Sequence, residues 1–172
     1  MNNTYSKNQD ISGNYTDRNT GALIVLIVFI AIPLAVGVVS ALLTRDAMVM
    51  FNSMNKPPFA PPAWLFPVAW TILYILMGIS CFLIFASSDE DRYTGLMLYA
   101  FQLVVNFTWS LIFFRLDAYV FAAVWLAILI IMIVALIINT SRYSKAAMIM
   151  LFPYLAWCCF AMYLNVGIAI LN

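Results

Sequence analysis

The sequence contains no histidine, and only 9% of its 172 residues are charged. The missing imidazole removes the usual metal ligand, the usual general base and the usual activator of a nucleophile. We therefore expect no metal site and no cofactor, and we assign no catalytic residue. The net charge of +1 also gives no basis for binding nucleic acid or another polyanion.

Cysteine is scarce as well, because the chain has three of them and all lie in apolar runs. Cys158 and Cys159 are adjacent, so a helix directs them to different faces. Cys81 lies far from both in the sequence. This spacing suits neither a disulfide framework nor a metal site.

Hydrophobic residues, in contrast, make up 66% of the chain. A soluble domain, in which roughly a quarter of the residues are charged, cannot use that much apolar surface. We predict an all-α integral membrane protein, a bundle of five transmembrane helices in one domain over residues 21–172, after a polar, disordered tail at 1–20. The runs of about 20 or more apolar residues that can span a membrane are Gly21 to Leu43, Ala63 to Ala86, Gly95 to Phe114, Tyr119 to Ile138 and Ala146 to Leu171.

The connections between these runs differ in length. Arg115 to Ala118 is so short that it forces a tight antiparallel hairpin. Thr44 to Pro62 is long, and long loops in compact bundles tend to be functional lids. Prolines restrict this loop, so it can be held over a cavity without regular structure. The predicted lid residues are Lys56, Pro57, Pro58, Phe59, Pro61 and Pro62.

The basic residues predict the orientation in the membrane. Five spans place the two ends of the chain on opposite sides, with an excess of basic residues on the N-terminal side. The positive-inside rule therefore predicts a cytoplasmic N-terminus. The N-terminal side carries Lys7, Arg18, Arg92, Arg142 and Lys145, and the other side carries Arg45, Lys56 and Arg115.

Inside the spans, amides and aromatic rings take the place of charges. No acidic or basic residue is expected at membrane depth, where ion-coupled transporters and proton pumps keep one. Gln102 and Asn106 are four residues apart and Trp109 follows three later, so all three share one helix face. We predict that this face points into the bundle, because an unpaired amide in hydrocarbon costs several kcal/mol.

Two more aromatic stripes follow helical spacing, and with this face they can converge on one cavity. Packing explains Trp70 and Trp157 equally well, and the amides can simply bridge helices. Trp64 suits an interface anchor, and Trp125, with no polar companion in its run, suits packing. The stripes are Phe66, Trp70, Tyr74, Met77 and Cys81 in the second helix, and Pro153, Trp157, Phe160 and Leu164 in the fifth.

Three segments resemble signature blocks of the TspO/MBR family of translocator and tryptophan-rich sensory proteins. They are KPPFAPPAWLFPVAWTILYILMGI from Lys56, QLVVNFTWSLIFF from Gln102 and PYLAWCCFAMYLN from Pro153. The resemblance implies a five-helix bundle, often dimeric, with a pocket under the first loop that binds porphyrins such as protoporphyrin IX. Carried over to this sequence, the implied pocket residues are Trp70, Tyr74, Asn106, Trp109, Trp157 and Ala161.

The resemblance also extends to sterols and lipids, but one motif departs from it. Val166, Gly167 and Ile170 occupy the stretch where animal members carry a tyrosine and a basic residue for cholesterol, which speaks against that motif here. Our preferred hypothesis is a tetrapyrrole-binding sensory protein. The alternatives are an enzyme that degrades porphyrin with light and oxygen, and a passive translocator of porphyrin or sterol.

We expect protoporphyrin between the second, third and fifth spans, with Trp70 and Trp157 packing on the macrocycle and Asn106 near a polar edge. The expected location is the inner membrane of a prokaryotic cell, with the mitochondrial outer membrane as the alternative.

Overall fold

The computed structural model describes residues 3–172, with side chains from Thr20 onward. The described chain forms helices only, and five of them are long and apolar enough to cross a membrane, which confirms the predicted class and spans. We expect a disordered tail at residues 1–20. Of these residues only Thr20 has a described side chain, so this expectation stays a prediction. The helices are α1 (Asn3–Leu43), α2 (Ala47–Ser53), α3 (Leu65–Phe85), α4 (Arg92–Phe114), α5 (Tyr119–Ser141) and α6 (Lys145–Leu171).

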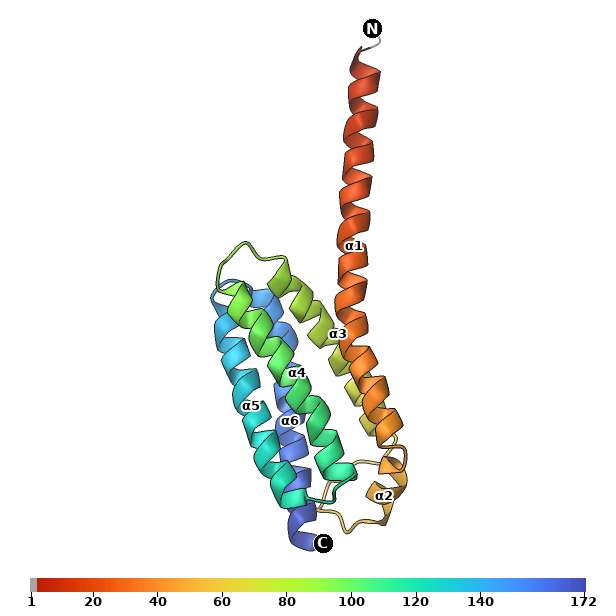
Figure 1. The fold of residues 1–172 in the computed structure, drawn as a ribbon, viewed down its shortest axis with the longest axis vertical. Coiled ribbons are helices and arrows are strands. Elements are labelled where there is room, and N and C mark those ends of the chain that lie inside the picture. The colour runs from red at the N-terminus through yellow and green to blue at the C-terminus, as the bar shows by residue number, and fades with distance from the viewer. Residues whose placement is uncertain (1–2) are drawn as a thin grey trace.

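The five long helices pack side by side, and α2 lies across one end of the bundle (Figure 1). Helix α3 contacts α1, α4 and α6, while α5 fills the far side between α4 and α6. Helix α1 packs mainly against α3 and α4. In its membrane-spanning part, Thr20–Leu43, just 6% of the most apolar window is buried, against 33–39% in the other four spans. Helix α1 is therefore the peripheral helix of the bundle.

Local sequence explains where the helices begin and end. The prolines up to Pro62 cannot continue a helix, and α3 starts soon after them, with Pro67 in its first turn where a missing N–H costs nothing. The hydroxyl of Ser144 accepts the backbone N–H of Ala147 at 3.3 Å and caps α6. Between α4 and α5, Asp117 has a φ of 51°, a conformation that Asp tolerates. The predicted tight hairpin is confirmed.

Two glycines let α1 approach α3 closely. A Cβ atom on Gly78 of α3 would lie 2.5 Å from the Cα of Ile30 in α1. A Cβ on Gly37 of α1 would lie 2.4 Å from the Tyr74 ring in α3. Neither position has room for a side chain, so the small residues set the distance between the helices.

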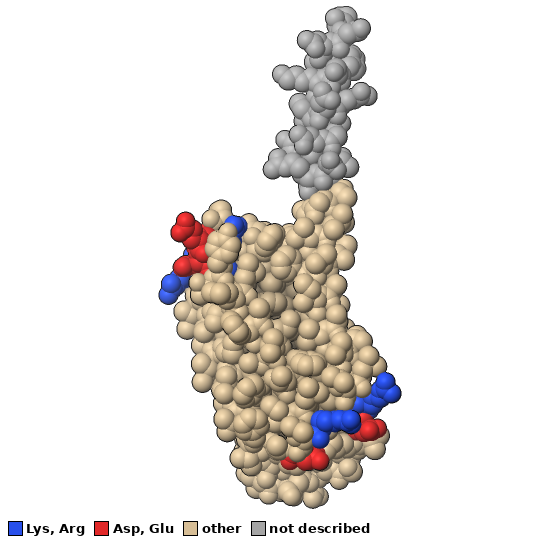
Figure 2. Space-filling view, viewed as in Figure 1, with Lys and Arg blue, Asp and Glu red and all other residues tan. Residues whose placement is uncertain are grey.

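Charged side chains gather at the two ends of the molecule and leave the flank between them apolar (Figure 2). From Thr20 onward, none of the buried residues is acidic or basic. The exposed flank instead carries large apolar residues such as Ile32, Ile72, Phe101 and Ile131. A surface of this kind is stable only against lipid, so the chain is an integral membrane protein.

Candidate functional site

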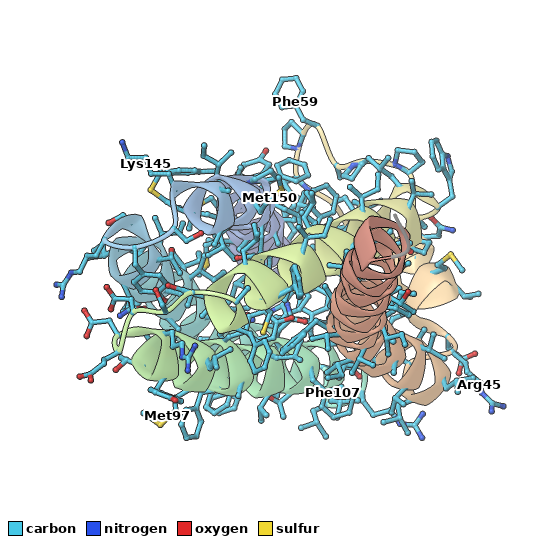
Figure 3. All side chains as sticks on the ribbon, turned by 90° about the horizontal axis from the view of Figure 1, so that it is seen from above. Arg45, Phe59, Met97, Phe107, Lys145 and Met150 are labelled. Atoms are coloured by element: carbon cyan, nitrogen blue, oxygen red, sulfur yellow. The ribbon has the colours of Figure 1, made fainter. Side chains whose placement is uncertain are left out.

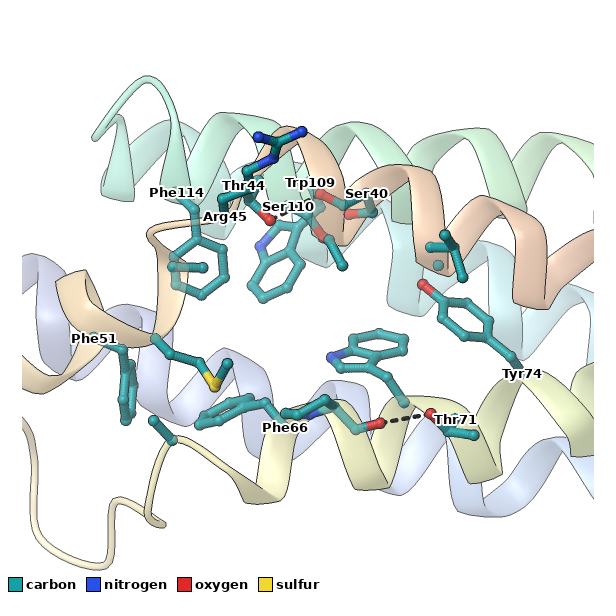
Figure 4. A pocket seen from close by; sticks show the side chains of 18 of the residues that line it. Ser40, Thr44, Arg45, Phe51, Phe66, Thr71, Tyr74, Trp109, Ser110 and Phe114 are labelled. Atoms are coloured by element: carbon teal, nitrogen blue, oxygen red, sulfur yellow. Dashed lines mark hydrogen bonds between the residues drawn. The ribbon is translucent and has the colours of Figure 1, made fainter.

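A cavity of about 310 Å³ opens between α1, α3 and α4, at the end of the bundle that α2 covers. Figure 4 shows it from close by, with Phe66 and Thr71 of α3 facing Trp109 and Ser110 of α4 across the hollow. Aromatic rings dominate the walls. They belong to Phe51, Phe66, Trp70, Tyr74, Trp109 and Phe114.

Helix α2 is the part of the first loop that covers this cavity. Ala47, Met48 and Phe51 line the cavity from α2. Phe51 is 3% exposed, and its ring centroid lies 4.8 Å from that of Phe66 on α3. The sequence did not predict this helix, because seven residues are too few to show a helical period.

The proline segment, residues 56–62, lies beside α2 and lines no part of the cavity. It rests on the end of α6, where Pro57 is buried and a Cβ on Gly167 would lie 2.6 Å from its ring. The Tyr163 hydroxyl donates to the Pro58 carbonyl at 2.7 Å. Phe59 is 90% exposed with a φ of 64°, and it projects away from the bundle (Figure 3).

The start of this segment, at Asn55 and Lys56, also makes contacts. The Asn55 backbone N–H donates to Oδ1 of Asn172 at 3.0 Å, and Nδ2 of Asn172 donates back to the Asn55 carbonyl at 2.9 Å. The Lys56 ammonium lies 5.1 Å from the centroid of the Phe51 ring. Among the predicted lid residues, Lys56 is therefore the one whose side chain lies over a ring of the cavity wall.

Trp70 occupies the centre of the aromatic wall. Its ring centroid lies 5.5 Å from Tyr74 and 6.5 Å from Trp109. Trp109 is 5% exposed, and its indole N–H donates to Oδ1 of Asn165 on α6 at 3.3 Å. This hydrogen bond fixes the Trp109 ring from behind, so the wall is rigid before any ligand arrives.

Behind the wall, a buried hydrogen-bond network joins α3, α4 and α6. The Tyr74 hydroxyl donates to Oδ1 of Asn106 at 3.1 Å, and Nδ2 of Asn106 donates to the Tyr154 hydroxyl at 3.1 Å. Tyr154 in turn donates to Oε1 of Gln102 at 2.8 Å. Asn106 thus supports the cavity through Tyr74 and does not line it.

The prediction that one face of α4 points into the bundle is confirmed. Gln102 is fully buried, Asn106 is 1% exposed and Trp109 is 5% exposed. The Gln102 amide is only partly hydrogen-bonded. Its Oε1 accepts from Tyr154, but its Nε2 has no hydrogen-bond partner among the described residues.

Helix α6 turns a different face inward from the aromatic stripe of the sequence. Trp157 and Ala161 do not line the cavity. Ala161 is buried in the core, and the half-buried Trp157 packs its ring 5.9 Å from Phe66, outside the hollow. Tyr154 and Asn165 need buried partners, and their hydrogen bonds fix the rotation of the helix. Of the predicted stripe, only Leu164 is buried. The buried residues of α6 are Ala147, Leu151, Tyr154, Cys158, Ala161, Leu164, Asn165 and Ile168.

The sequence reading missed a group of polar residues on the cavity wall, which we call the polar corner. Ser40 and Thr44 lie at the end of α1, Arg45 follows directly, and Ser110 faces them from α4 (Figure 4). In the described part of the chain, we find no partner for the Ser40 and Ser110 hydroxyls or the Arg45 guanidinium. The sequence pattern that indicates this group is Ser40 and Thr44, one helical turn apart, followed by Arg45 at the end of the first span.

The site offers binding surface more than reactive groups. From residue 20 onward, no cluster of three acidic, Cys or His side chains is placed to hold a metal ion. The cysteines are free, and none of them lines the cavity. Apolar rings with a few polar groups at one side are the composition of a small-molecule pocket.

Comparison with known proteins adds the family. A sequence profile described as the TspO/MBR family matches residues 29–171. The chain is 36% identical over 153 residues to the tryptophan-rich protein TspO of Chlorobaculum tepidum, covering 87% of this chain and 97% of the relative. It is 34% identical over 148 residues to the tryptophan-rich protein TspO of Archaeoglobus fulgidus, covering 86% and 96%.

A mammalian protein is also similar to this chain. The translocator protein of Bos taurus is 33% identical over 141 residues, covering 80% of this chain and 83% of the relative. The family match begins inside α1 at residue 29 and runs to the end of α6 at Leu171, so it includes every helix that lines the cavity.

Proposed function

Because this chain belongs to the TspO/MBR family, we propose that it is a membrane protein with a sensory or transport role that binds a flat tetrapyrrole of the protoporphyrin type. The names of the relatives, which include a tryptophan-rich sensory protein and translocator proteins, support the general role. The resemblance of the three sequence blocks supports the ligand class.

The single observation that carries the proposal is the aromatic cavity. Its volume of about 310 Å³ falls at the lower end of the range of about 300–1,000 Å³ for small-molecule pockets. Trp70 and Trp109 line it, and aromatic rings attract flat, conjugated, apolar ligands. A large macrocycle would fill the hollow and extend toward α2, so we expect α2 to shift when the ligand binds.

Our proposal places the ligand between α1, α3 and α4. Trp70, Tyr74 and Trp109 would then contact it, and Asn106 would act from behind through Tyr74. The family resemblance also implies Trp157 and Ala161, which lie outside the hollow. Substitutions at Trp70 and Trp157 therefore distinguish the observed cavity from a pocket that extends to α6.

The test is a titration of the purified protein in detergent with protoporphyrin IX in the dark, followed by quenching of tryptophan fluorescence. Trp70→Ala is expected to weaken binding about tenfold and Trp70→Phe less, since Phe keeps much of the stacking area. Trp64→Ala is the matched control, because Trp64 is 62% exposed and lies outside the cavity. Unchanged affinity in folded Trp70→Ala and Trp109→Ala variants would refute the proposal.

Two further measurements use the same samples. Loss of affinity in Trp157→Ala would move the ligand toward α6 and restore the arrangement implied by the resemblance. Repeating the titration under light separates binding from turnover, because a degrading enzyme would consume the porphyrin and a sensory or passive transport protein would not.

A further inference from the structure

We propose that the polar corner binds the carboxylate groups of the ligand, and that Arg45 makes the protein prefer an acidic ring system over a neutral one. This inference rests on the proposed function, since it needs a flat ligand in the cavity. It goes further by assigning the ligand an orientation and a charge.

Free polar groups lie on one side of the cavity. On the other side Phe66 and Trp70 of α3 line it, and the Thr71 hydroxyl there already donates to the Pro67 carbonyl at 2.8 Å. Facing them, Ser40 and Thr44 at the end of α1 and Ser110 of α4 lie beside the Trp109 ring, and Arg45 follows with its guanidinium turned outward (Figure 4). A flat molecule with one charged edge has one favourable orientation in such a space. Its rings lie toward α3 and its charged edge lies toward the end of α1.

The polar corner supplies hydrogen-bond donors. The Thr44 hydroxyl already donates to the Ser40 carbonyl at 2.9 Å, but Ser40 and Ser110 have hydroxyl protons that no described residue accepts. A carboxylate accepts hydrogen bonds and donates none, so it suits these groups. Ser40 is 7% exposed and lines the cavity, so a ligand there can reach its hydroxyl.

Asn106, the other candidate contact for the polar edge of the ligand, is already occupied. Asn106 is 1% exposed, and both ends of its amide are engaged, by Tyr74 and Tyr154. A ligand carboxylate at Asn106 would have to displace a buried hydrogen bond and would meet no positive charge. The polar corner offers both free donors and a charge.

Arg45 is the one cationic side chain among the described residues that line the cavity. The nearby Lys56 is engaged, because its ammonium donates to the Asn52 carbonyl at 3.3 Å and lies over the Phe51 ring. The Arg45 side chain is exposed, and Figure 3 shows it pointing outward from the bundle. Turning it toward the cavity breaks no described contact, and such rotamer changes are common on binding.

The test compares protoporphyrin IX, which carries two carboxylates, with its dimethyl ester, which has the same ring and no charge. Dark titrations of the unaltered protein are expected to show about five- to tenfold tighter binding of the acid. Arg45→Gln should remove this preference by weakening the acid alone. Arg45→Lys should keep part of it, since an ammonium retains the charge but not the bidentate geometry.

Arg115→Gln is the matched control, because Arg115 is exposed at the same end of the bundle and does not line the cavity. It should leave both affinities unchanged. Raising the salt concentration from about 50 to 500 mM should weaken binding of the acid to the unaltered protein and leave Arg45→Gln unaffected. Unchanged binding of the ester shows that each variant remains folded.

The outcomes separate the two proposals. If the unaltered protein binds acid and ester equally, or if Arg45→Gln weakens both by the same factor, the carboxylate assignment is overturned while the proposed function stands. If neither porphyrin binds the unaltered protein, the proposed function fails and takes this inference with it.

Discussion

At the scale of single residues, the Asn106 amide joins neighbouring helices inside the bundle. It accepts from Tyr74 on α3 and donates to Tyr154 on α6, so one side chain holds three helices together. Each of these groups is buried, and water is not there to replace a lost partner. A buried hydroxyl without a partner costs more than the hydrogen bond itself contributed.

We predict that Asn106→Leu lowers the free energy of unfolding by about 1–3 kcal/mol. This exceeds the average of about 0.6 kcal/mol for one interhelical hydrogen bond, because Tyr74 loses its partner and Tyr154 loses one of two. Chemical denaturation in detergent measures the change. Asn52→Leu, at an exposed position of α2, is the control. Equal stability of the two variants would contradict the role of the network.

The indole of Trp125 corrects one expectation at this scale. The sequence reading gave it no polar companion, but its N–H donates to the Thr108 hydroxyl at 2.9 Å and to the Val105 carbonyl at 3.2 Å. Both partners belong to α4, whereas Trp125 belongs to α5. A search along the run that contains Trp125 cannot find a partner on a neighbouring helix.

At the scale of helices, the crossing of α1 and α3 depends on Gly78. The nearest atoms to an added Cβ are backbone atoms of Phe29 and Ile30, and backbone cannot move aside as the end of a side chain can. The same two helices also line the cavity, together with α2 and α4.

We predict that Gly78→Ala forces α1 away from α3 and destabilises the protein by about 1–3 kcal/mol. Thermal unfolding in detergent, read by circular dichroism, measures the loss. Gly21→Ala in the same pair of helices is the control, because a Cβ there would have no atom within 4 Å. It should leave stability unchanged or raise it slightly. A stable Gly78→Ala protein would show that the close crossing is not required.

Also at the scale of helices, the proline segment is held in place by its contacts with α6. We predict that Tyr163→Phe speeds backbone hydrogen exchange at residues 55–60, because it removes the 2.7 Å hydrogen bond to the Pro58 carbonyl. Mass spectrometry of exchanged peptides measures the rate. Tyr93→Phe, at the opposite end of the bundle, should leave the segment unchanged. Equal exchange in the two variants would mean that Pro57 and Asn172 suffice to hold the segment.

At the scale of the whole molecule, five spans place the start of α1 and the end of α6 on opposite sides of the membrane. The basic residues predict that the N-terminal side is cytoplasmic. The Arg142–Asp91 pair on that side is exposed at 65% and 51%, so it adds little stability, and its charges contribute mainly to orientation.

We predict that, in intact cells of a prokaryotic host, a membrane-impermeant thiol reagent labels Asn172→Cys and not Ser6→Cys. Both variants are made in a chain whose three cysteines are replaced by alanine. Opening the cells should expose Ser6→Cys, which is the control for its reactivity. Labelling of Ser6→Cys in unopened cells would reverse the orientation.

The sequence by itself determined the class, the spans and the inward face of α4. The thickness of the hydrocarbon core fixes the length of an apolar run, and the cost of an unpaired amide directs Gln102 and Asn106 inward, so neither result needs knowledge of the neighbouring helices. The tertiary structure alone decided which residues line the cavity. Adjacent helix positions differ by about 100° in direction, so the rotation of α6 about its axis decides that Tyr154 is fully buried while Trp157 is half-buried and lies outside the cavity. The polar corner likewise joins Arg45 to Ser110, 65 positions later in the chain, and only the packing of α1 beside α4 brings the two together.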